Sequence, residues 1–415
     1  MQSATVLPTF AEAFRFWLKL GFISFGGPAG QIAIMQTELV ERKRWIDQAR
    51  FLHALNYCML LPGPEAQQLA IYIGWLLHRT AGGIVAGVLF VLPSVFILWT
   101  LSFIYVRFGN VPWIAAIFYG LKPAVLAIVA AAVIRIGRKA LRTRLMWGLA
   151  AAAFIAIYFF RVPFPLIIIA AGAIGFLTNR APAEAEVKSE RVGLRRTIAV
   201  FCTWLAVWWV PLLSLGAVLG WNHTVFREAV FFVKAAVLTF GGAYAVLPYV
   251  SQQAVDTYHW LAPGQMLDGL GLAETTPGPL IMVLQFVGFV GAWNQPGNLS
   301  PLLAATLGAL ATTWATFAPC FLWIFAGAPY IERLRNNSAL TAALSTVTAA
   351  VVGVILNLAV WFALHVIFPP NRGVDWFAVV LALVAFVGML RWKWDVIPVV
   401  LGSGVVGLLH LVIAR

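Results

Sequence analysis

SFGGP at residues 24–28 and LPGP at 61–64 return later in the chain as TFGG at 239–242 and TPGP at 276–279. A shift of 215 residues (239 minus 24) aligns both pairs of motifs. The same shift aligns further residues: Phe16 with Phe231, Lys19 with Lys234, and Trp45 with Trp260. Because one offset holds over this much of the chain, the sequence predicts an internal duplication that produced two related halves.

The composition of the chain indicates a membrane protein. Of its 415 residues, 62% are hydrophobic and only 10% are charged, whereas soluble domains carry about 25% charged residues. Apolar stretches such as 81–106 and 145–160 are long enough for helices that cross much or all of a bilayer, and they lack the alternation of a barrel strand. We therefore expect an all-α polytopic membrane protein, embedded in the bacterial inner membrane with lipid as its surroundings.

The basic residues predict topology rather than nucleic-acid binding. The formal net charge is +13, but the Lys and Arg residues lie in short loops between apolar spans, as the positive-inside rule expects of cytoplasmic loops. The loop at 38–50 holds four of them, and its counterpart at 251–265 holds none. The first ten residues lack the features of a signal peptide, so we expect a mature, cytoplasmic amino terminus.

This charge asymmetry predicts that the two halves insert with opposite orientation. One unpaired helix between the halves would invert the second half, and breaks at the GGP and PGP motifs would allow re-entrant segments, about thirteen hydrophobic segments in all. The predicted organisation is a first repeat at 1–178, a cytoplasmic linker at 179–196, an inverting helix at 197–223 and a second repeat at 224–415.

The paired motifs are the candidate binding site. Proline and glycine end helices, and broken backbone is tolerated at membrane depth only where it is buried in protein or lines a wet cavity. Helices that restart after a break point their positive dipole ends toward the break, which favours anions. The alternative is a simple kink or a close helix crossing. The candidate residues are Ser24, Gly26, Gly27, Pro28, Pro62, Gly63 and Pro64, with Thr239, Gly241, Gly242, Thr275, Thr276, Pro277, Gly278 and Pro279 in the second half.

Charged residues inside apolar segments are further candidates, because each costs several kcal/mol in lipid unless it faces water, a partner or a substrate. Lys19 and Lys234 occupy equivalent positions and suit a divalent anion, and Lys122 is the third basic candidate. Their alternative is snorkelling to the interface. Glu65 and Glu274 beside the PGP motifs are the predicted coupling residues. The matched pair His53 and Asp268 could carry protons or lie at the interface, and Gln67 and Gln68 are local candidates only.

The sequence contains no catalytic, metal or cofactor signature. It lacks the ATP-binding loop, the nucleophile elbow and the zinc helix, and Cys58, Cys202 and Cys320 lie in separate apolar segments. We therefore expect a protein that is not an enzyme, holds no metal or cofactor and moves its substrate by means of gradients.

Four stretches of the chain resemble the chromate ion transporter family. They are SFGGPAGQIAIMQTELVERKRWI (24–46), LLPGPEAQQLAIYIGWLL (60–77), LTFGGAYAVLPYV (238–250) and GLAETTPGPLIMVLQFVGFVGAW (271–293). The resemblance implies a two-domain, long-chain member that exports chromate across the inner membrane and confers chromate resistance, with sulfate as the look-alike anion. This chain has Gln31 where family members usually carry histidine. The driving force would be the membrane potential, the proton gradient or both. An oxyanion-selective channel and a sulfate transporter stay open as alternatives, as do a proton partner and a homodimer.

Overall fold

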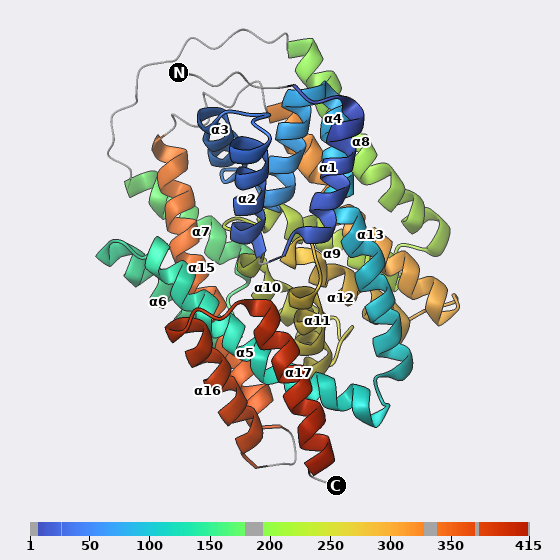
Figure 1. Ribbon diagram of the computed structural model, residues 1–415, viewed down its shortest axis with the longest axis vertical. Coiled ribbons are helices and arrows are strands. Elements are labelled where there is room, and N and C mark those ends of the chain that lie inside the picture. The colour runs from blue at the N-terminus through green and yellow to red at the C-terminus, as the bar shows by residue number, and fades with distance from the viewer. Residues whose placement is uncertain (1–6, 26, 179–193, 328–337, 370–372, 414–415) are drawn as a thin grey trace.

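The chain folds entirely into helices (Figure 1). The computed structural model describes residues 7–25, 27–178, 194–327, 338–369 and 373–413, so Gly26 and most of the predicted linker lie outside the described residues. The first half contains α1 (Phe10–Ile23), α2 (Gly27–Gln36), the π-helix η1 (Thr37–Arg42), α3 (Gln48–Cys58), α4 (Glu65–Phe108), α5 (Pro112–Ala140), α6 (Arg144–Tyr158) and α7 (Phe164–Thr178). No strand occurs among these described segments.

The second half repeats this order after the connecting helix α8 (Leu194–Leu219). It contains α9 (Thr224–Leu238), α10 (Ala243–Ser251), the π-helix η2 (Gln252–Thr257), α11 (Pro263–Thr275), the short 3-10 helix η3 (Leu280–Met282), α12 (Val283–Asn294), α13 (Pro301–Gly327), α15 (Ser338–Ile367), α16 (Trp376–Arg391) and α17 (Val396–Ile413). Within the described ranges, six helices are long and apolar enough to cross a membrane, namely α4, α5, α8, α13, α15 and α17. The prediction of an all-α membrane protein is confirmed.

The helices that precede the glycine motifs are too short for a full crossing. Helix α1 has 14 residues and α9 has 15, which at 1.5 Å per residue span about 21–23 Å of a hydrocarbon core roughly 30 Å thick. Both helices end at the motif, so the chain breaks before a full crossing is complete. This agrees with the place at which the sequence predicted the breaks.

The 215-residue repeat extends to irregular details of the backbone. The π-helices η1 and η2 begin and end at equivalent residues. Just after them, Arg44 and His259 adopt positive φ angles of 54° and 53°. Such left-handed backbone is uncommon for residues other than glycine, and its recurrence at matched positions indicates that both halves descend from one folded unit.

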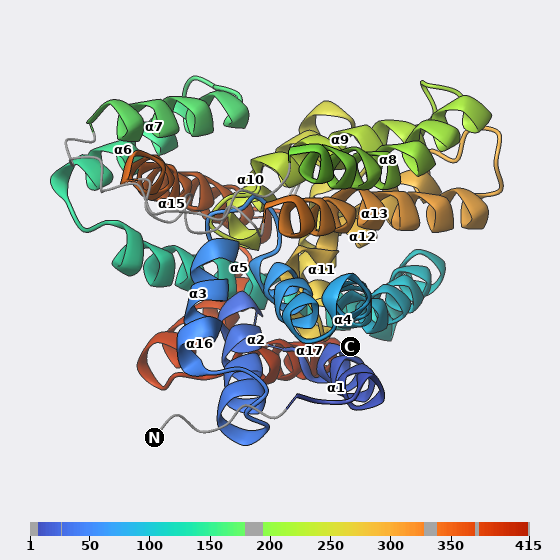
Figure 2. The ribbon, with the colours of Figure 1, turned by 90° about the horizontal axis from the view of Figure 1, so that it is seen from above.

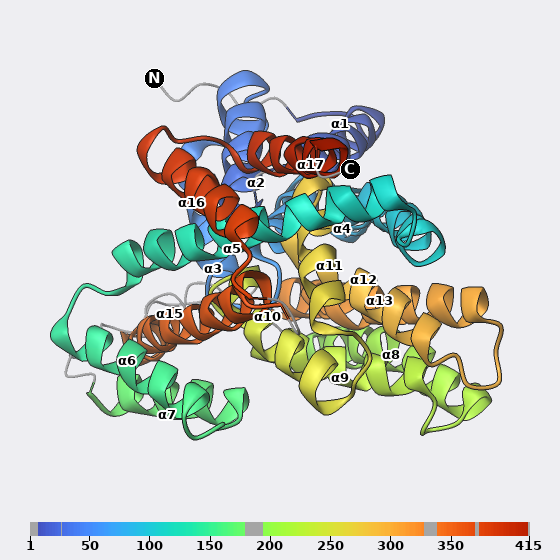
Figure 3. The ribbon, with the colours of Figure 1, turned by 90° about the horizontal axis from the view of Figure 1, so that it is seen from below.

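The two halves exchange their carboxyl-terminal helix pairs. Helix α5 of the first half packs against α16 and α17 of the second, and α15, which holds the place of α5 in the second half, packs against α6 and α7 of the first. Figures 2 and 3 show α6, α7 and α15 as one group and α8, α9 and α13 as another, with α10 and α11 between them. The halves are therefore interlocked rather than separate.

Helix α8 differs slightly from the predicted inverting helix at 197–223. It ends at Leu219, where Gly220 has a φ of +100°, and α9 begins only four residues later. Tryptophan side chains attach α8 to α13, since the Trp208 Nε1–H donates to the carbonyl of Ala315 (2.9 Å) and the ring of Trp204 stacks on Phe321. Most of the remaining surface of α8 is exposed, as expected of a helix that faces lipid.

We predict that the two halves, expressed as separate chains cut within residues 179–193, assemble with each other. The physical reason is that α5 and α15 each need the other half to cover them. Co-purification through a tag on one half measures assembly. Gly120→Leu should weaken it strongly, because a side chain there would overlap the backbone oxygen of Ser403 on α17.

Gly148→Leu on α6 is the matched control, because a side chain at this position meets nothing within 4 Å. Equal recovery of the partner half with both variants would contradict the interlocked packing.

Candidate functional site

The four broken motifs meet in the interior, where each half is hydrogen-bonded to the other. The Gly63 N–H donates to the carbonyl of Thr239 (2.8 Å), and the Gly278 N–H donates to the carbonyl of Ser24 (2.6 Å). Gly63 is equivalent to Gly278, and Ser24 to Thr239, so the two bonds are related as in a two-fold interface. Each PGP motif is thus joined to the glycine motif of the opposite half.

Glycine is required at the centre of each PGP motif. Gly63 and Gly278 have φ angles of +115° and +105°, a region that other residues avoid. A side chain on Gly278 would overlap the Ser94 hydroxyl. At the glycine motifs, Gly27 and Gly242 also have positive φ angles, and a side chain on either would meet nothing within 4 Å. The motifs therefore combine a tight crossing with open space beside it.

A second pair of residues supports the crossing and was not recognised from the sequence. In the middle of α4, the Ser94 hydroxyl donates to the carbonyl of Pro277 in the other half. In the middle of α13, the Cys320 sulfur lies 3.8 Å from Gln68 Nε2, which donates to the carbonyl of Pro62. The sequence feature that could have indicated Ser94 and Cys320 is a proline directly before each of them. These prolines, Pro93 and Pro319, are 226 residues apart (319 minus 93), so the 215-residue offset does not align them.

The predicted hydroxyl donors are already engaged in this conformation. The Ser24 hydroxyl donates to the carbonyl of Leu20 (2.6 Å), and the Thr239 hydroxyl donates to that of Ala235 (2.7 Å). Thr275 and Thr276 also donate to carbonyls of their own helix. These hydroxyl groups donate their hydrogens to backbone carbonyls near the breaks, so in this conformation they do not donate to a ligand.

A basic cavity of about 940 Å³ opens beside the first glycine motif. Phe25 and Gly30 line it at one end, and residues of α5, α16 and α17 complete its wall. Its charged lining residues are Arg135, Arg138, Lys139, Lys393 and Asp395. Four positive side chains against one negative side chain make this cavity attractive to anions.

Arg135 connects the basic cavity with the predicted coupling residue Glu274. The Tyr244 hydroxyl donates to Glu274 Oε1 (2.6 Å), and the positive charge of Arg135 lies near both groups, although Arg135 and Glu274 form no ion pair among the described contacts. Glu274 lies at the end of α11, directly before TTPGP. Arg135 is not among the site residues predicted from the sequence, because Tyr244 and Glu274 lie in the other half of the chain.

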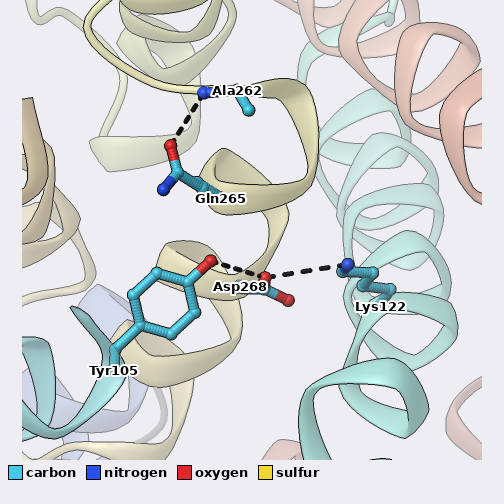
Figure 4. A network of polar contacts seen from close by, with 5 residues as sticks. All are labelled: Tyr105, Lys122, Ala262, Gln265 and Asp268. Atoms are coloured by element: carbon cyan, nitrogen blue, oxygen red, sulfur yellow. Dashed lines mark hydrogen bonds and ion pairs between the residues drawn. The ribbon is translucent and has the colours of Figure 1, made fainter. Parts of the chain in front are cut away.

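Lys122 lines a smaller polar cavity of about 260 Å³. Figure 4 shows its polar contacts. Lys122 Nζ lies 3.7 Å from Asp268 Oδ2, and the Tyr105 hydroxyl donates to the same oxygen at 2.9 Å. Asp268 is only 4% exposed, whereas Lys122 remains in contact with the cavity. In Figure 4, Gln265 lies on the same helix, where its side-chain oxygen accepts the N–H of Ala262.

Helices α5 and α11 pack against each other. We call the line of their charged residues, Lys122 and Arg135 on α5 with Asp268 and Glu274 on α11, the α5–α11 seam. Lys122 and Arg135 are 13 residues apart on α5 (135 minus 122), which is about 20 Å of helix. Asp268 and Glu274 are the corresponding acids on α11. Lys122 is the cation of α5 that lines the smaller cavity, and its ion-pair partner Asp268 lies on α11. Arg135, Arg138 and Lys139 of α5 line the basic cavity, and Arg135 lies near Glu274 of α11.

The structure does not bring Lys19 and Lys234 to the breaks. Both side chains are exposed, because each helix buries a different face. The buried residues of α1 are Ala13, Phe16, Trp17, Leu20 and Gly21. Glu65 is half-buried at the start of α4, directly after Pro64. His53 is half-buried on α3.

Comparisons with known proteins agree with this arrangement of two repeats. The family model described as Chromate transporter matches residues 11–176 and 226–408. A chromate transport protein of Pseudomonas aeruginosa is 33% identical over 408 residues, covering 96% of this chain and 92% of that protein. One of Cupriavidus metallidurans is 30% identical over 402 residues, covering 96% and 93%.

An uncharacterized transporter of Methanocaldococcus jannaschii is 26% identical over 413 residues, covering 97% of this chain and 95% of that protein. No solved structure matches the chain significantly. The family model covers most of the sequence in two regions, and the bacterial relatives align along nearly its whole length. The chain therefore belongs to the chromate transporter family.

Proposed function

We propose that this protein is a secondary transporter that exports chromate, and accepts related divalent oxyanions such as sulfate, across the bacterial inner membrane. The observation that carries the proposal is the α5–α11 seam, which presents Lys122 to the smaller polar cavity and Arg135 to the basic cavity beside the first glycine motif. Export of an anion is favoured by a negative interior, by roughly 2.3 kcal/mol per charge per 100 mV. The relatives named chromate transport proteins support chromate as the substrate.

The chemistry of the seam suits a tetrahedral dianion. Arg135 presents a planar fork of donors that matches two oxygens of an oxyanion, and Lys122 supplies a compact charge. In the conformation described here, Asp268 forms an ion pair with Lys122 and Glu274 lies near Arg135. An arriving oxyanion replaces the carboxylate as the partner of the cation. The released carboxylate then gains from taking up a proton, which makes Glu274, together with Glu65 beside the first PGP motif, a route for proton coupling.

A carrier is favoured over a channel. A channel needs one continuous open path, whereas the two cavities share no lining residue within the described part of the chain. The crossing that joins the halves is buried, since Ser24 is fully covered and Thr239 is 1% exposed. We propose that the halves have opposite orientation and move against each other about this crossing, so that the two cavities admit the anion in turn.

The proposed activity can be tested with purified protein in proteoliposomes loaded with labelled chromate. We expect saturable chromate movement that accelerates when unlabelled chromate or sulfate is present on the opposite side, because a carrier returns faster when it is loaded. Membrane potential and pH gradient are imposed separately. Chromate conductance that does not saturate and shows no exchange would favour the channel, and sulfate movement without chromate movement would favour a sulfate transporter.

We predict that Lys122→Met and Arg135→Gln each raise the half-saturating chromate concentration at least about tenfold, which corresponds to about 1.4 kcal/mol. The physical reason is that each change removes one of the cations that line the two cavities. The measurement is the concentration dependence of chromate exchange in proteoliposomes.

Lys19→Met and Lys234→Met are the matched controls, because they remove a lysine from exposed faces of α1 and α9. We expect near-normal exchange from both. If the controls lose exchange while Lys122→Met and Arg135→Gln keep it, the binding site lies with the paired lysines that the sequence suggested.

The opposite orientation of the halves predicts opposite accessibility of equivalent loops. Cysteines introduced as Lys43→Cys and Thr257→Cys should react with a membrane-impermeant thiol reagent from opposite sides of the membrane. The background replaces the exposed Cys202 with Ser and keeps Cys58 and Cys320, which are buried. Labelling of both positions from the same side in intact and everted vesicles would show that the halves are parallel.

A further inference from the structure

Glu228 on α9 is a fully buried carboxyl group without a hydrogen-bond partner. Its side chain is 0% exposed, and neither carboxyl oxygen has a partner among the described residues. The equivalent position in the first half, 215 residues earlier, is Ala13. The carboxyl is therefore an addition to the second half, and neither the repeat nor the proposed anion site accounts for it.

Two glycines make the space that the carboxyl occupies. A side chain on Gly291 of α12 would overlap Glu228 Oε1, and a Cβ on Gly308 of α13 would lie 2.9 Å from Oε2. Trp260 lies on the same side, since its Cβ would be 2.9 Å from a Cβ on Gly291, and its indole N–H also has no partner. The niche fits a carboxyl group closely, and Glu228 fills it.

The elements around Glu228 offer it no compensating charge. Helix α12 carries no ionisable side chain, and α13 carries only Cys320. The ionisable residues of the other neighbouring segments are Arg195, Arg196 and Cys202 on α8, Arg227 and Lys234 on α9, Tyr244 and Tyr249 on α10, and Asp256, Tyr258 and His259 before α11. None of these described groups interacts electrostatically with Glu228. A carboxylate ion without a partner is very unfavourable in such a site, so the side chain here is the neutral acid.

The same elements that enclose Glu228 also hold the crossed breaks. Helix α9 ends at Thr239, whose carbonyl accepts the Gly63 N–H. Helix α13 carries Cys320, which packs beside the first PGP motif, and η3 and α12 follow directly on the second. All three helices belong to the second half, so a conformational change in the transport cycle would have to move α9, α12 and α13 apart to admit water to the carboxyl.

Resting on the proposed transport activity, we propose that Glu228 is a proton-binding site of the transport cycle. The carboxyl is protonated in the conformation described here, and it releases its proton to water when α9, α12 and α13 separate. A neutral carboxyl does not repel a bound dianion, whereas a carboxylate does, so proton and oxyanion binding favour each other. Each cycle then moves one proton together with the anion.

The test compares wild-type protein with Glu228→Gln, which keeps the shape of the side chain and is permanently neutral. In proteoliposomes containing a pH-sensitive dye, wild-type protein should move protons when chromate or sulfate is added. Glu228→Gln should still exchange labelled anion for unlabelled anion, but its anion-dependent pH change should be smaller than that of wild-type protein, because only the proton carried by Glu228 is lost. Glu41→Gln, at an exposed carboxyl of η1, is the control and should retain the pH change.

Infrared spectroscopy tests the protonation state independently of transport. The absorption of protonated carboxyl groups at neutral pH should lose one carboxyl's intensity in Glu228→Gln relative to wild-type protein. Glu228→Ala, which restores the residue of the first half, is the second variant if the glutamine protein does not fold. An unchanged anion-dependent pH change or an unchanged carboxyl band would overturn the proposal. Loss of anion exchange by wild-type protein would instead overturn the proposed function.

Discussion

The structure depends on how unpaired backbone groups are satisfied where helices break inside the membrane. An N–H without a partner in hydrocarbon costs several kcal/mol, so a chain that interrupts its helices at glycine and proline must find other acceptors. Here the acceptors belong to the opposite half: Gly63 donates to Thr239 and Gly278 donates to Ser24. Neither half can satisfy its own PGP motif in this way, and the need for a partner explains why both halves occur in one interlocked fold.

The α5–α11 seam places charged side chains in the walls of the two cavities. A lysine or arginine inside a membrane protein is costly unless it has a carboxylate, water or a substrate near it. Lys122 forms an ion pair with Asp268, and Arg135 lies near Glu274, while each cation also borders a cavity. The same charges therefore stabilise the empty protein and are available to an oxyanion, which competes with the carboxylates. In the proposed transport cycle, this competition couples anion movement to proton movement.

The duplication is imperfect, and its departures carry information. Backbone features such as η1 and η2 recur at equivalent residues, whereas Glu228 stands where the first half has Ala13. Gln31 stands at a position where the resemblance to the family leads one to expect histidine, and it is fully buried with its amide donating to the carbonyl of Ser24. Residues that differ between the halves therefore break the symmetry of the repeat around the crossing.

The amino-acid sequence by itself determined the all-α membrane class and the positions of the breaks, because hydrophobic length and helix-breaking residues act locally. It also indicated Lys122 and Glu274, since a charge inside an apolar segment is visible without a structure. Tertiary structure decided which residues face one another. Lys19 and Lys234 match in sequence, yet they point away from the core because α1 and α9 bury other faces. Arg135, Ser94 and Cys320 gained their roles from partners in the opposite half, and contacts across so many residues leave no local pattern in the chain.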